Sequence, residues 1–103
     1  MNHARLAVAL LPLLAATAAG ASPALATKNG CSICHATDRK VVGPAFRDVA
    51  RRYEGVKDAE AELVRSIKSG GSWKWGPASM PPQSALSDAD ARALAAWILD
   101  GAK

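Results

Sequence analysis

The chain has 103 residues, half of them apolar, and a formal net charge of +4. This length allows one domain, and the apolar fraction excludes a disordered or purely polar chain. The basic bias is mild and acidic residues are interleaved with the lysines and arginines. Because a nucleic-acid-binding protein shows a denser basic stripe, we expect no nucleic-acid partner.

The first element in chain order is an uncharged, Leu- and Ala-rich stretch over residues 6–19 that follows Arg5. This arrangement is typical of a secretory signal peptide, which has a basic head, an apolar segment of roughly 7 to 15 residues and small residues at its cleavage site. Pro12 interrupts the stretch, which is shorter than the about 20 residues of a membrane span. We therefore expect export by a cleavable signal peptide and no stable membrane insertion; an uncleaved anchor is the alternative.

Two sites of the A-x-A type compete for cleavage, one ending at Ala21 and one ending at Ala26. We favour Ala21, because Ser22 would then cap a helix that begins with a proline. The prediction is a cleaved signal peptide over residues 1–21 and a mature domain over residues 22–103. A domain of this size buries a small core and often needs a disulfide, a metal or a bound cofactor.

A short motif follows the first expected helix, which spans residues 24–29. The motif is Cys31-Ser32-Ile33-Cys34-His35, and it holds the only two cysteines of the chain. Cys-x-x-Cys-His is the attachment signature of c-type haem. Two thiols about one helical turn apart can add to the two vinyl groups of one porphyrin, and the next residue can turn its imidazole onto the iron. A disulfide between Cys31 and Cys34 and a zinc site are the alternatives. A thioredoxin-like disulfide motif occurs in a βαβ context, and no convincing strand is found. A closed zinc site needs a fourth ligand, normally Cys or His, and none remains.

Three further helices are expected from apolar residues at helical spacing. They are residues 45–53, residues 59–69 between Asp58 as N-cap and Gly70 as stop, and a last helix between Ser87 as N-cap and Gly101. No convincing strand is found, so the fold class is all-α, with about four short helices and with loops that carry the haem motif and Met80. Because these helices lack enough apolar surface to close a core, we expect the porphyrin to be the core.

Met80 is the candidate for the second axial ligand of the iron. Once the signal peptide is removed, His35 and Met80 are the only histidine and the only methionine left. Two prolines follow Met80 in a segment too rich in Pro and Gly for a helix or a central strand. Such a loop loses less entropy when it holds a ligand. Packing of Met80, or an open sixth position on the iron, is the alternative.

The mature chain resembles the small bacterial class I cytochromes c, in order and over essentially its whole length. The likeness rests on residues 29–35, 42–46, 75–82 and 94–98. The resemblance implies a class I cytochrome c fold wrapped around one covalently attached haem c with its iron, held by Cys31 and Cys34. It also implies that the Pro44 carbonyl accepts a hydrogen bond from the ring of His35, and that Trp75 contacts a haem propionate.

In these proteins the first and last helices cross beside the haem, and the resemblance implies that Gly30 permits their close approach. Two positions depart from the pattern. Ser66 stands where relatives often have an arginine that pairs with a propionate, which leaves Arg65 or Lys74 as a replacement. Gln83 stands where relatives often have an asparagine bonded to the ligand sulfur, and the sequence leaves open whether Gln83 reaches Met80.

The resemblance implies a soluble electron carrier of the periplasm that cycles between ferrous and ferric haem. Two filled axial positions leave no place for a substrate, and His/Met ligation raises the reduction potential. We therefore expect no enzyme and assign no catalytic residue, since the protein binds, orients and tunes its cofactor. A monomer is expected, with an upstream cytochrome complex and a terminal reductase or oxidase as redox partners. A haem enzyme or gas sensor with an open sixth position, or a dedicated haem subunit of an oxidoreductase, is the alternative.

The resemblance further implies an apolar edge patch around the exposed haem edge, made of Ile33, Val41, Val42, Pro77, Ala78, Pro81 and Pro82. Basic side chains at the rim of this patch, from Arg39, Lys40 and Arg47, would steer an approaching partner. Redox encounters use small interfaces, below about 1,200 Å² in total. The alternative is that Val41 and Val42 are core residues beside the porphyrin.

Overall fold

The computed structural model describes residue 4, residues 7–12 and residues 23–103. The predicted cleavage site after Ala21 and the predicted cap Ser22 lie outside the described residues. Residues 7–12 form no helix or strand, and Leu10 and Leu11 are 90% and 84% exposed. In the part of the chain that the structure describes, no helix has the length and apolar character needed to cross a bilayer.

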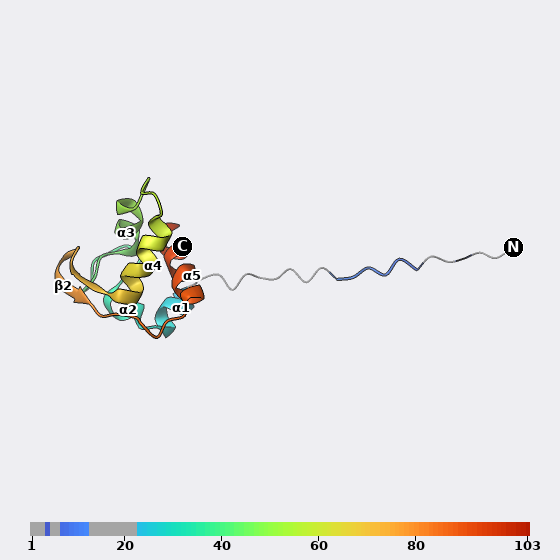
Figure 1. Ribbon diagram of the computed structural model, residues 1–103, viewed down its shortest axis with the longest axis horizontal. Helices are drawn as coiled ribbons and strands as arrows, with labels where there is room; N and C mark the ends of the chain where they lie inside the picture. Colours follow the sequence, from blue (N-terminus) through green and yellow to red (C-terminus); the bar gives the residue numbers. More distant parts are fainter. Residues whose placement is uncertain (1–3, 5–6, 13–22) are drawn as a thin grey trace.

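Residues 23–103 form five helices and one antiparallel pair of strands (Figure 1). In chain order these are α1 (Pro23–Lys28), α2 (Cys31–Cys34), α3 (Phe46–Arg52), α4 (Ala59–Ser69), β1 (Gly71–Trp73), β2 (Gly76–Met80) and α5 (Asp88–Leu99). The expected all-α class is confirmed, with two differences: the structure has a fifth helix, α2, and β1 and β2 form a small sheet that was not expected. The helix predicted over residues 59–69 coincides with α4, and the first two predicted helices differ from α1 and α3 by one residue at each end.

The prediction that loops carry both the haem motif and Met80 is wrong. Cys31 and Cys34 begin and end a one-turn helix, α2, and Met80 is the last residue of β2. The glycines and prolines around Met80 do argue against a central strand. A two-stranded sheet, however, contains only edge strands, in which a proline such as Pro77 is tolerated.

The helix ends follow the predicted signals with one exception. The Ser87 side chain accepts a hydrogen bond from the Asp90 N–H at 3.1 Å and so caps α5, as expected. Gly70 ends α4 with a φ of 66°, which suits a glycine. Asp58 precedes α4 as predicted, but its backbone is left-handed and its side chain makes no capping hydrogen bond.

The expectation that Gly30 permits a close approach of the first and last helices is also wrong. Among the described residues, a Cβ at this position would meet only the Ile33 side chain, at 3.7 Å, so no helix approaches it closely. Its φ of 75° explains the glycine instead, because the chain turns here from α1 into α2. Helix α1 still reaches the core, through the buried Ala26.

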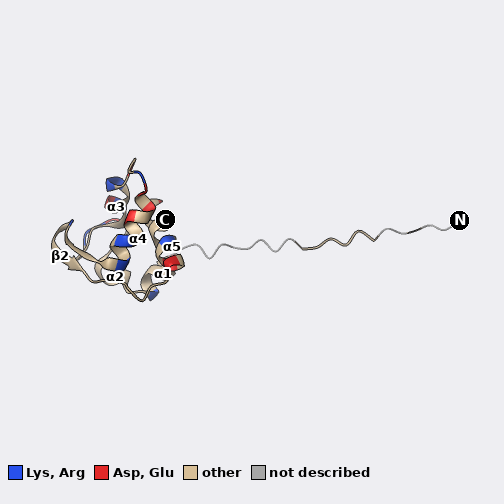
Figure 2. Ribbon diagram, in the orientation of Figure 1, with Lys and Arg blue, Asp and Glu red and all other residues tan. Residues whose placement is uncertain are grey.

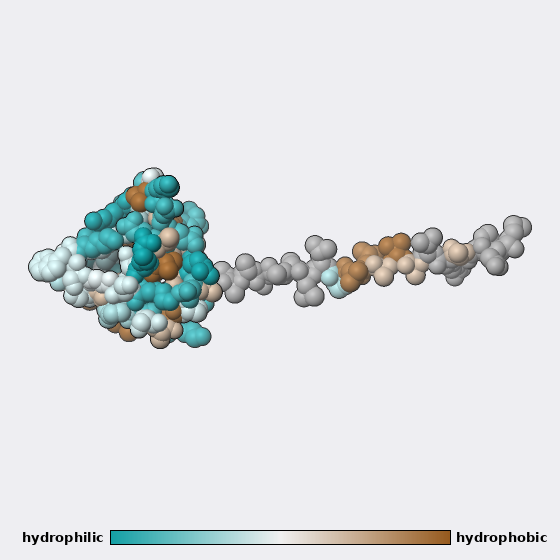
Figure 3. Space-filling view, viewed as in Figure 1, coloured by the Kyte–Doolittle hydropathy of each residue, from teal (hydrophilic) through white to brown (hydrophobic). Residues whose placement is uncertain are grey.

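The core forms where α5 packs against α3 and α4. Its buried apolar residues are Ala26, Phe46, Val49, Tyr53, Leu63, Ile67, Leu86, Ala91, Leu94, Ala95, Ile98 and Ala102. An ion pair between Lys68 and Asp88 also joins α4 to α5, and the hydrogen bond from Lys68 lowers the pKa of the Asp88 carboxyl group. The outer face seen in Figure 3 is largely hydrophilic over the helices.

Candidate functional site

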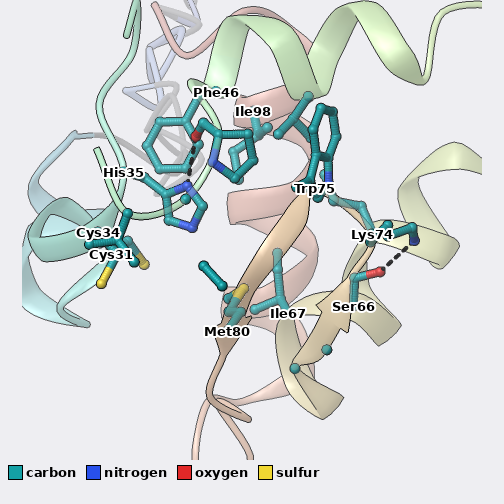
Figure 4. A pocket seen from close by; sticks show the side chains of 18 of the residues that line it. Cys31, Cys34, His35, Phe46, Ser66, Ile67, Lys74, Trp75, Met80 and Ile98 are labelled. Carbon is teal, nitrogen blue, oxygen red and sulfur yellow. Dashed lines mark hydrogen bonds between the residues drawn. The ribbon is translucent and has the colours of Figure 1, made fainter. Parts of the chain in front are cut away.

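A cavity of about 250 Å³ lies in the middle of the fold, and residues from every helix and from both strands line it. Eight of the twelve core residues form part of its wall, so the core is open on this side. All of the site residues predicted from the sequence line the cavity, namely Cys31, Cys34, His35, Pro44, Trp75 and Met80. Figure 4 shows His35 next to the two cysteines and Met80 on a separate strand.

The spacing of the two cysteines follows from helix α2. One helical turn separates Cys31 from Cys34, and His35 then leaves the helix with an extended backbone, at φ −124° and ψ 143°. Both thiols are free of a disulfide. Burial raises the pKa of the Cys31 thiol above its ordinary value, and a hydrogen bond to its own backbone partly offsets this. Among the residues that the structure describes, no group of three or more His, Cys, Asp and Glu side chains suits a metal ion.

Three contacts fix the imidazole of His35. Its Nδ1 lies 2.8 Å from the carbonyl oxygen of Pro44. Since a carbonyl oxygen can only accept, Nδ1 donates the hydrogen bond, and in the neutral imidazole Nε2 is the nitrogen with the lone pair. The ring stacks on Phe46, with 5.1 Å between the centroids and 18° between the planes. A Cβ on Gly43 would lie 2.8 Å from Nδ1, so only glycine leaves room for the ring in this position.

Strand pairing places Met80. It lies opposite Gly71 of β1, and in the neighbouring pair the hydroxyl groups of Ser72 and Ser79 are 2.7 Å apart. The Met80 side chain is half-buried and lines the cavity. The thioether therefore reaches the cavity from an element that is separate in sequence from the one carrying His35.

The segment after Met80 is held by its backbone. Gly70 has positive φ, and a Cβ there would lie 2.8 Å from the Pro82 nitrogen and against the Pro81 carbonyl carbon. The Gln83 side-chain nitrogen donates to the Pro81 carbonyl at 3.2 Å. In the described part of the chain no hydrogen bond joins Gln83 to the Met80 sulfur, so Gln83 supports the turn next to Met80.

Lys74 and Arg65, the two candidates for a contact with a haem propionate, lie in different places. Lys74 lines the cavity, and its Nζ donates to the Tyr53 hydroxyl at 3.0 Å and to the Ser66 hydroxyl at 3.3 Å. The carboxylate of Glu62 lies 3.7 Å from the same Nζ. Arg65 instead lines a different hollow, on the surface between α4 and α5. Lys74 is thus the cation beside Ser66 at the cavity (Figure 4).

The residues of the apolar edge patch are exposed. Ile33 is 77% exposed, Val41 46% and Val42 50%. Val42 also lines the cavity, whereas Ile33 and Val41 do not. The patch therefore lies at the surface next to the opening of the cavity.

Comparison with known proteins decides what the cavity is for. The profile of the cytochrome c family matches residues 19–102. The chain belongs to the cytochrome c family. This cytochrome c is 50% identical over 88 residues to cytochrome c-551 of Pseudomonas aeruginosa, and the match covers 84% of each chain.

Two solved structures share the fold of this cytochrome c. The crystal structure of wild-type cytochrome c552 of Nitrosomonas europaea has a TM-score of 0.74 and 50% sequence identity, and the match covers 76% of this chain and 96% of that chain. The class 1 cytochrome MtoD of Sideroxydans lithotrophicus ES-1 has a TM-score of 0.64 and 27% identity, over 78% of this chain and 91% of that chain. The expected class I fold is confirmed.

This cytochrome c is a small electron-transfer protein that carries one covalently attached haem c with its iron, as expected from the sequence. The chemistry of the cavity fits this group. Two free thiols lie beside an imidazole with an available nitrogen, and a thioether and an apolar wall complete the lining. Lys74 adds a positive charge that suits the carboxylates of a haem.

Sequence reasoning did not assign three residues to the site of this cytochrome c. The Arg52 guanidinium lies 4.5 Å from the centroid of the Trp75 ring and donates to the Lys74 carbonyl at 2.7 Å. Gly43 makes room for His35, and Gly70 makes room for the turn after Met80. These roles depend on contacts between segments, which the local pattern does not reveal, although it did mark Gly70 as the end of a helix.

Proposed function

We propose that this cytochrome c is a soluble periplasmic electron carrier whose axial ligands are His35 and Met80, with Cys31 and Cys34 as the thioether attachment points. When bound, the haem supplies a one-electron ferrous/ferric couple. The observation that supports this proposal best is that imidazole and thioether reach one cavity from two separate elements. This pair suits a carrier, because two filled axial positions leave no open site for a substrate.

The protein residues have three tasks in this proposal. The Pro44 carbonyl accepts a hydrogen bond from Nδ1–H of His35, so Nε2 is the nitrogen that would hold the iron. The Met80 thioether favours the ferrous state and raises the potential. The apolar wall of the cavity would keep water from the metal. The lower local dielectric would also tune the reduction potential.

We assign the propionate contact to Lys74 and Trp75. Lys74 is positioned by Tyr53 and Ser66, which hold its ammonium group beside the cavity. Arg52 stacks on the Trp75 ring and helps to orient the indole. In this arrangement Lys74 supplies the positive charge that relatives often have as an arginine at the position of Ser66.

Export by a signal peptide over residues 1–21 accounts for the periplasmic location. Cleavage after Ala26 would remove the greater part of α1 together with Ala26, which is 1% exposed in the core, whereas cleavage after Ala21 keeps α1 whole. Mass spectrometry of the exported protein should therefore show one haem added to a chain that starts at Ser22. A chain that starts at Thr27, or one that retains its leader, would contradict this proposal.

The optical spectrum of the ferric holoprotein, combined with a redox titration, tests the axial ligands. We expect a low-spin spectrum, a weak near-infrared band from sulfur-to-iron charge transfer and a single one-electron step. A high-spin ferric spectrum would favour a haem enzyme or gas sensor with an open position. Size-exclusion chromatography of the periplasmic fraction should give a monomer; elution with a large oxidoreductase would indicate a dedicated subunit.

The proposed partners are an upstream cytochrome complex, which reduces the haem, and a terminal reductase or oxidase, which accepts the electron. The exposed apolar edge patch supports this assignment, since a brief encounter needs a small water-excluding contact next to the cofactor. The basic residues that precede Val41, Arg39 and Lys40, are exposed and can steer an acidic partner toward the patch.

A further inference from the structure

Trp73 is exposed at a position that is unfavourable for a large side chain. Its side chain is 76% exposed at the point where β1 turns into β2. Its backbone has a φ of 67°, in the left-handed region that bulky residues avoid. The strand register is irregular between Ser72 and Trp73. The fold therefore holds an indole in water and under backbone strain.

Trp73 pairs with Gly76 in the strand register, but no ring contact with a described residue involves its side chain. Trp75 lies under Arg52, and Trp97 donates to the Lys103 carbonyl at 3.0 Å and packs edge-on against Phe46. The Trp73 side chain has no comparable hydrogen bond or ring contact with any described residue. A strained residue whose exposed indole has no such internal contact points to a contact outside the molecule.

The position of Trp73 relates it to the haem cavity. Its two neighbours, Ser72 and Lys74, both line the cavity, whereas Trp73 does not. The indole is therefore outside the cavity wall, one residue from groups that face the cofactor. In Figure 3 the hairpin at the left is pale, while the surface over the helices is mostly hydrophilic.

The charges beside the hairpin are mainly positive. Arg52 donates to the backbone of Lys74, and no carboxylate of the described residues lies within 4.0 Å of its guanidinium group. Lys74 has one carboxylate neighbour, Glu62, at 3.7 Å. Arg51 pairs with Asp48 at 3.4 Å on the same helix, α3. Figure 2 shows basic residues in blue on α3. An apolar indole next to an unpaired arginine suits a partner with an acidic surface.

We propose that Trp73 is the anchor of a docking surface for an acidic redox protein, with Arg52 as its charged neighbour. Tryptophan and arginine are the residues that most often dominate binding at protein interfaces. Burial of the indole by the partner would bring that protein to the cavity wall next to Ser72 and Lys74. This inference rests on the proposed function as an electron carrier.

The test replaces Trp73 with glycine, which removes the indole and relieves the strain together. The reduced holoprotein is mixed in a stopped-flow instrument with respiratory membranes from its source cells. We expect the bimolecular rate of oxidation to fall at least about tenfold, the loss expected when an interface anchor is removed. The unfolding temperature should rise by about 4 to 8 °C, because glycine adopts positive φ freely. Potential and optical spectrum should stay unchanged.

Two control variants and one control oxidant separate docking from other effects. Trp73→Phe keeps an aromatic ring and should retain most of the rate. Val56→Ser removes an apolar side chain that is 41% exposed and does not line the cavity, and it should change nothing. Ferricyanide, a small anion, should oxidise all three variants like the wild type, because it needs no anchor.

The outcomes distinguish this inference from the proposed function. If membranes oxidise Trp73→Gly as fast as the wild type, Trp73 is no anchor, and the carrier function is unaffected. If ferricyanide oxidises the wild type but the membranes do not, the carrier function itself is contradicted, and this inference fails with it. A slower reaction of Trp73→Gly with ferricyanide would also overturn the inference, because the defect would then lie at the haem.

Discussion

His35 shows how single residues define this haem site. The hydrogen bond to Pro44 selects the ring nitrogen that stays available, and Phe46 and Gly43 set the plane of the ring. Each contact restricts the rotation of the imidazole. The ring of this proposed ligand is therefore already oriented, and it would lose less conformational entropy on binding the iron. Met80 is positioned differently, by strand pairing through the backbone. The two proposed ligands therefore depend on different kinds of interaction.

Replacing Met80 by alanine should leave a folded haem protein with a lower potential. A thioether stabilises the ferrous state, and water or an external ligand does so less, so we expect a fall on the order of a hundred millivolts. The near-infrared sulfur-to-iron band should vanish. Gln83→Ala is the matched control and should keep the band, because Gln83 bonds to Pro81. A Met80→Ala protein with the parent's band and potential would make Met80 a packing residue.

Replacing Lys74 by methionine should also lower the potential. A cation beside the haem disfavours the more positive ferric state, so its loss favours oxidation, by roughly tens of millivolts. Lys74→Arg should preserve the potential because it preserves the charge. Arg65→Met removes one positive charge from the other hollow and should have a much smaller effect. Equal shifts for Lys74→Met and Arg65→Met would show that only the net charge matters and would contradict the assigned contact.

At the scale of elements, the junction between α4 and the hairpin controls the position of β2. Gly70 ends α4, and the chain enters β1 at Gly71, opposite Met80. Because Gly70 lacks a side chain, the end of α4 lies directly against the backbone after Met80. The short hairpin is marginal by itself, and this contact ties it to the helical core.

Gly70→Ala should destabilise the holoprotein and disturb the Met80 ligand. Both Gly70 and Gly55 have positive φ, 66° and 70°, but a Cβ at Gly55 would meet nothing within 4 Å. Gly55→Ala therefore measures the backbone strain alone, about 1–2 kcal/mol. Gly70→Ala should cost more in thermal unfolding and should weaken the near-infrared band, while Gly55→Ala leaves the band intact. Equal costs and equal bands in the two variants would remove the special role of Gly70.

At the scale of the whole molecule, the cofactor completes the core. Eight of the twelve buried core residues face the cavity, so the helices alone leave a gap where a globular domain is normally packed. The same cavity reaches the surface at Val42, beside the exposed Ile33 and Val41. The haem would therefore both stabilise the fold and exchange electrons at the protein surface.

The apolar edge patch should control the rate of exchange with a partner. Ile33→Glu places a charge in the patch without touching the cavity wall, so it should slow the reaction with an acidic acceptor and leave spectrum and potential nearly unchanged. Val56→Glu adds the same charge elsewhere on the surface and is the control. Neutralising Arg39 and Lys40 should chiefly flatten the dependence of the bimolecular rate on ionic strength. Unchanged kinetics in both the Ile33 and the Arg39/Lys40 variants would place docking elsewhere.

Local patterns predicted the helices well, because α4 and α5 carry apolar residues at helical spacing and recognisable end signals at Ser87 and Gly70. They failed at the hairpin. There, Pro77 and the glycines weaken every local signal for a strand, and the pairing of Gly71 with Met80 exists only between two segments. The explanation of Gly30 was wrong because the sequence does not distinguish two reasons for a glycine. A positive φ and a close approach of another segment both favour this residue.

The sequence by itself determined the attachment motif at Cys31, Cys34 and His35 and singled out Met80 as the proposed second ligand, because few residues of the chain can bind haem or its iron. Covalent spacing and residue type are local properties, and they can be read without the fold. Only the tertiary structure decided that Lys74, not Arg65, faces the cavity, and that Gly43 and Gly70 make room for the histidine and for the turn after Met80. These are contacts between distant segments, and packing determines which side of a helix or a hairpin meets the cofactor.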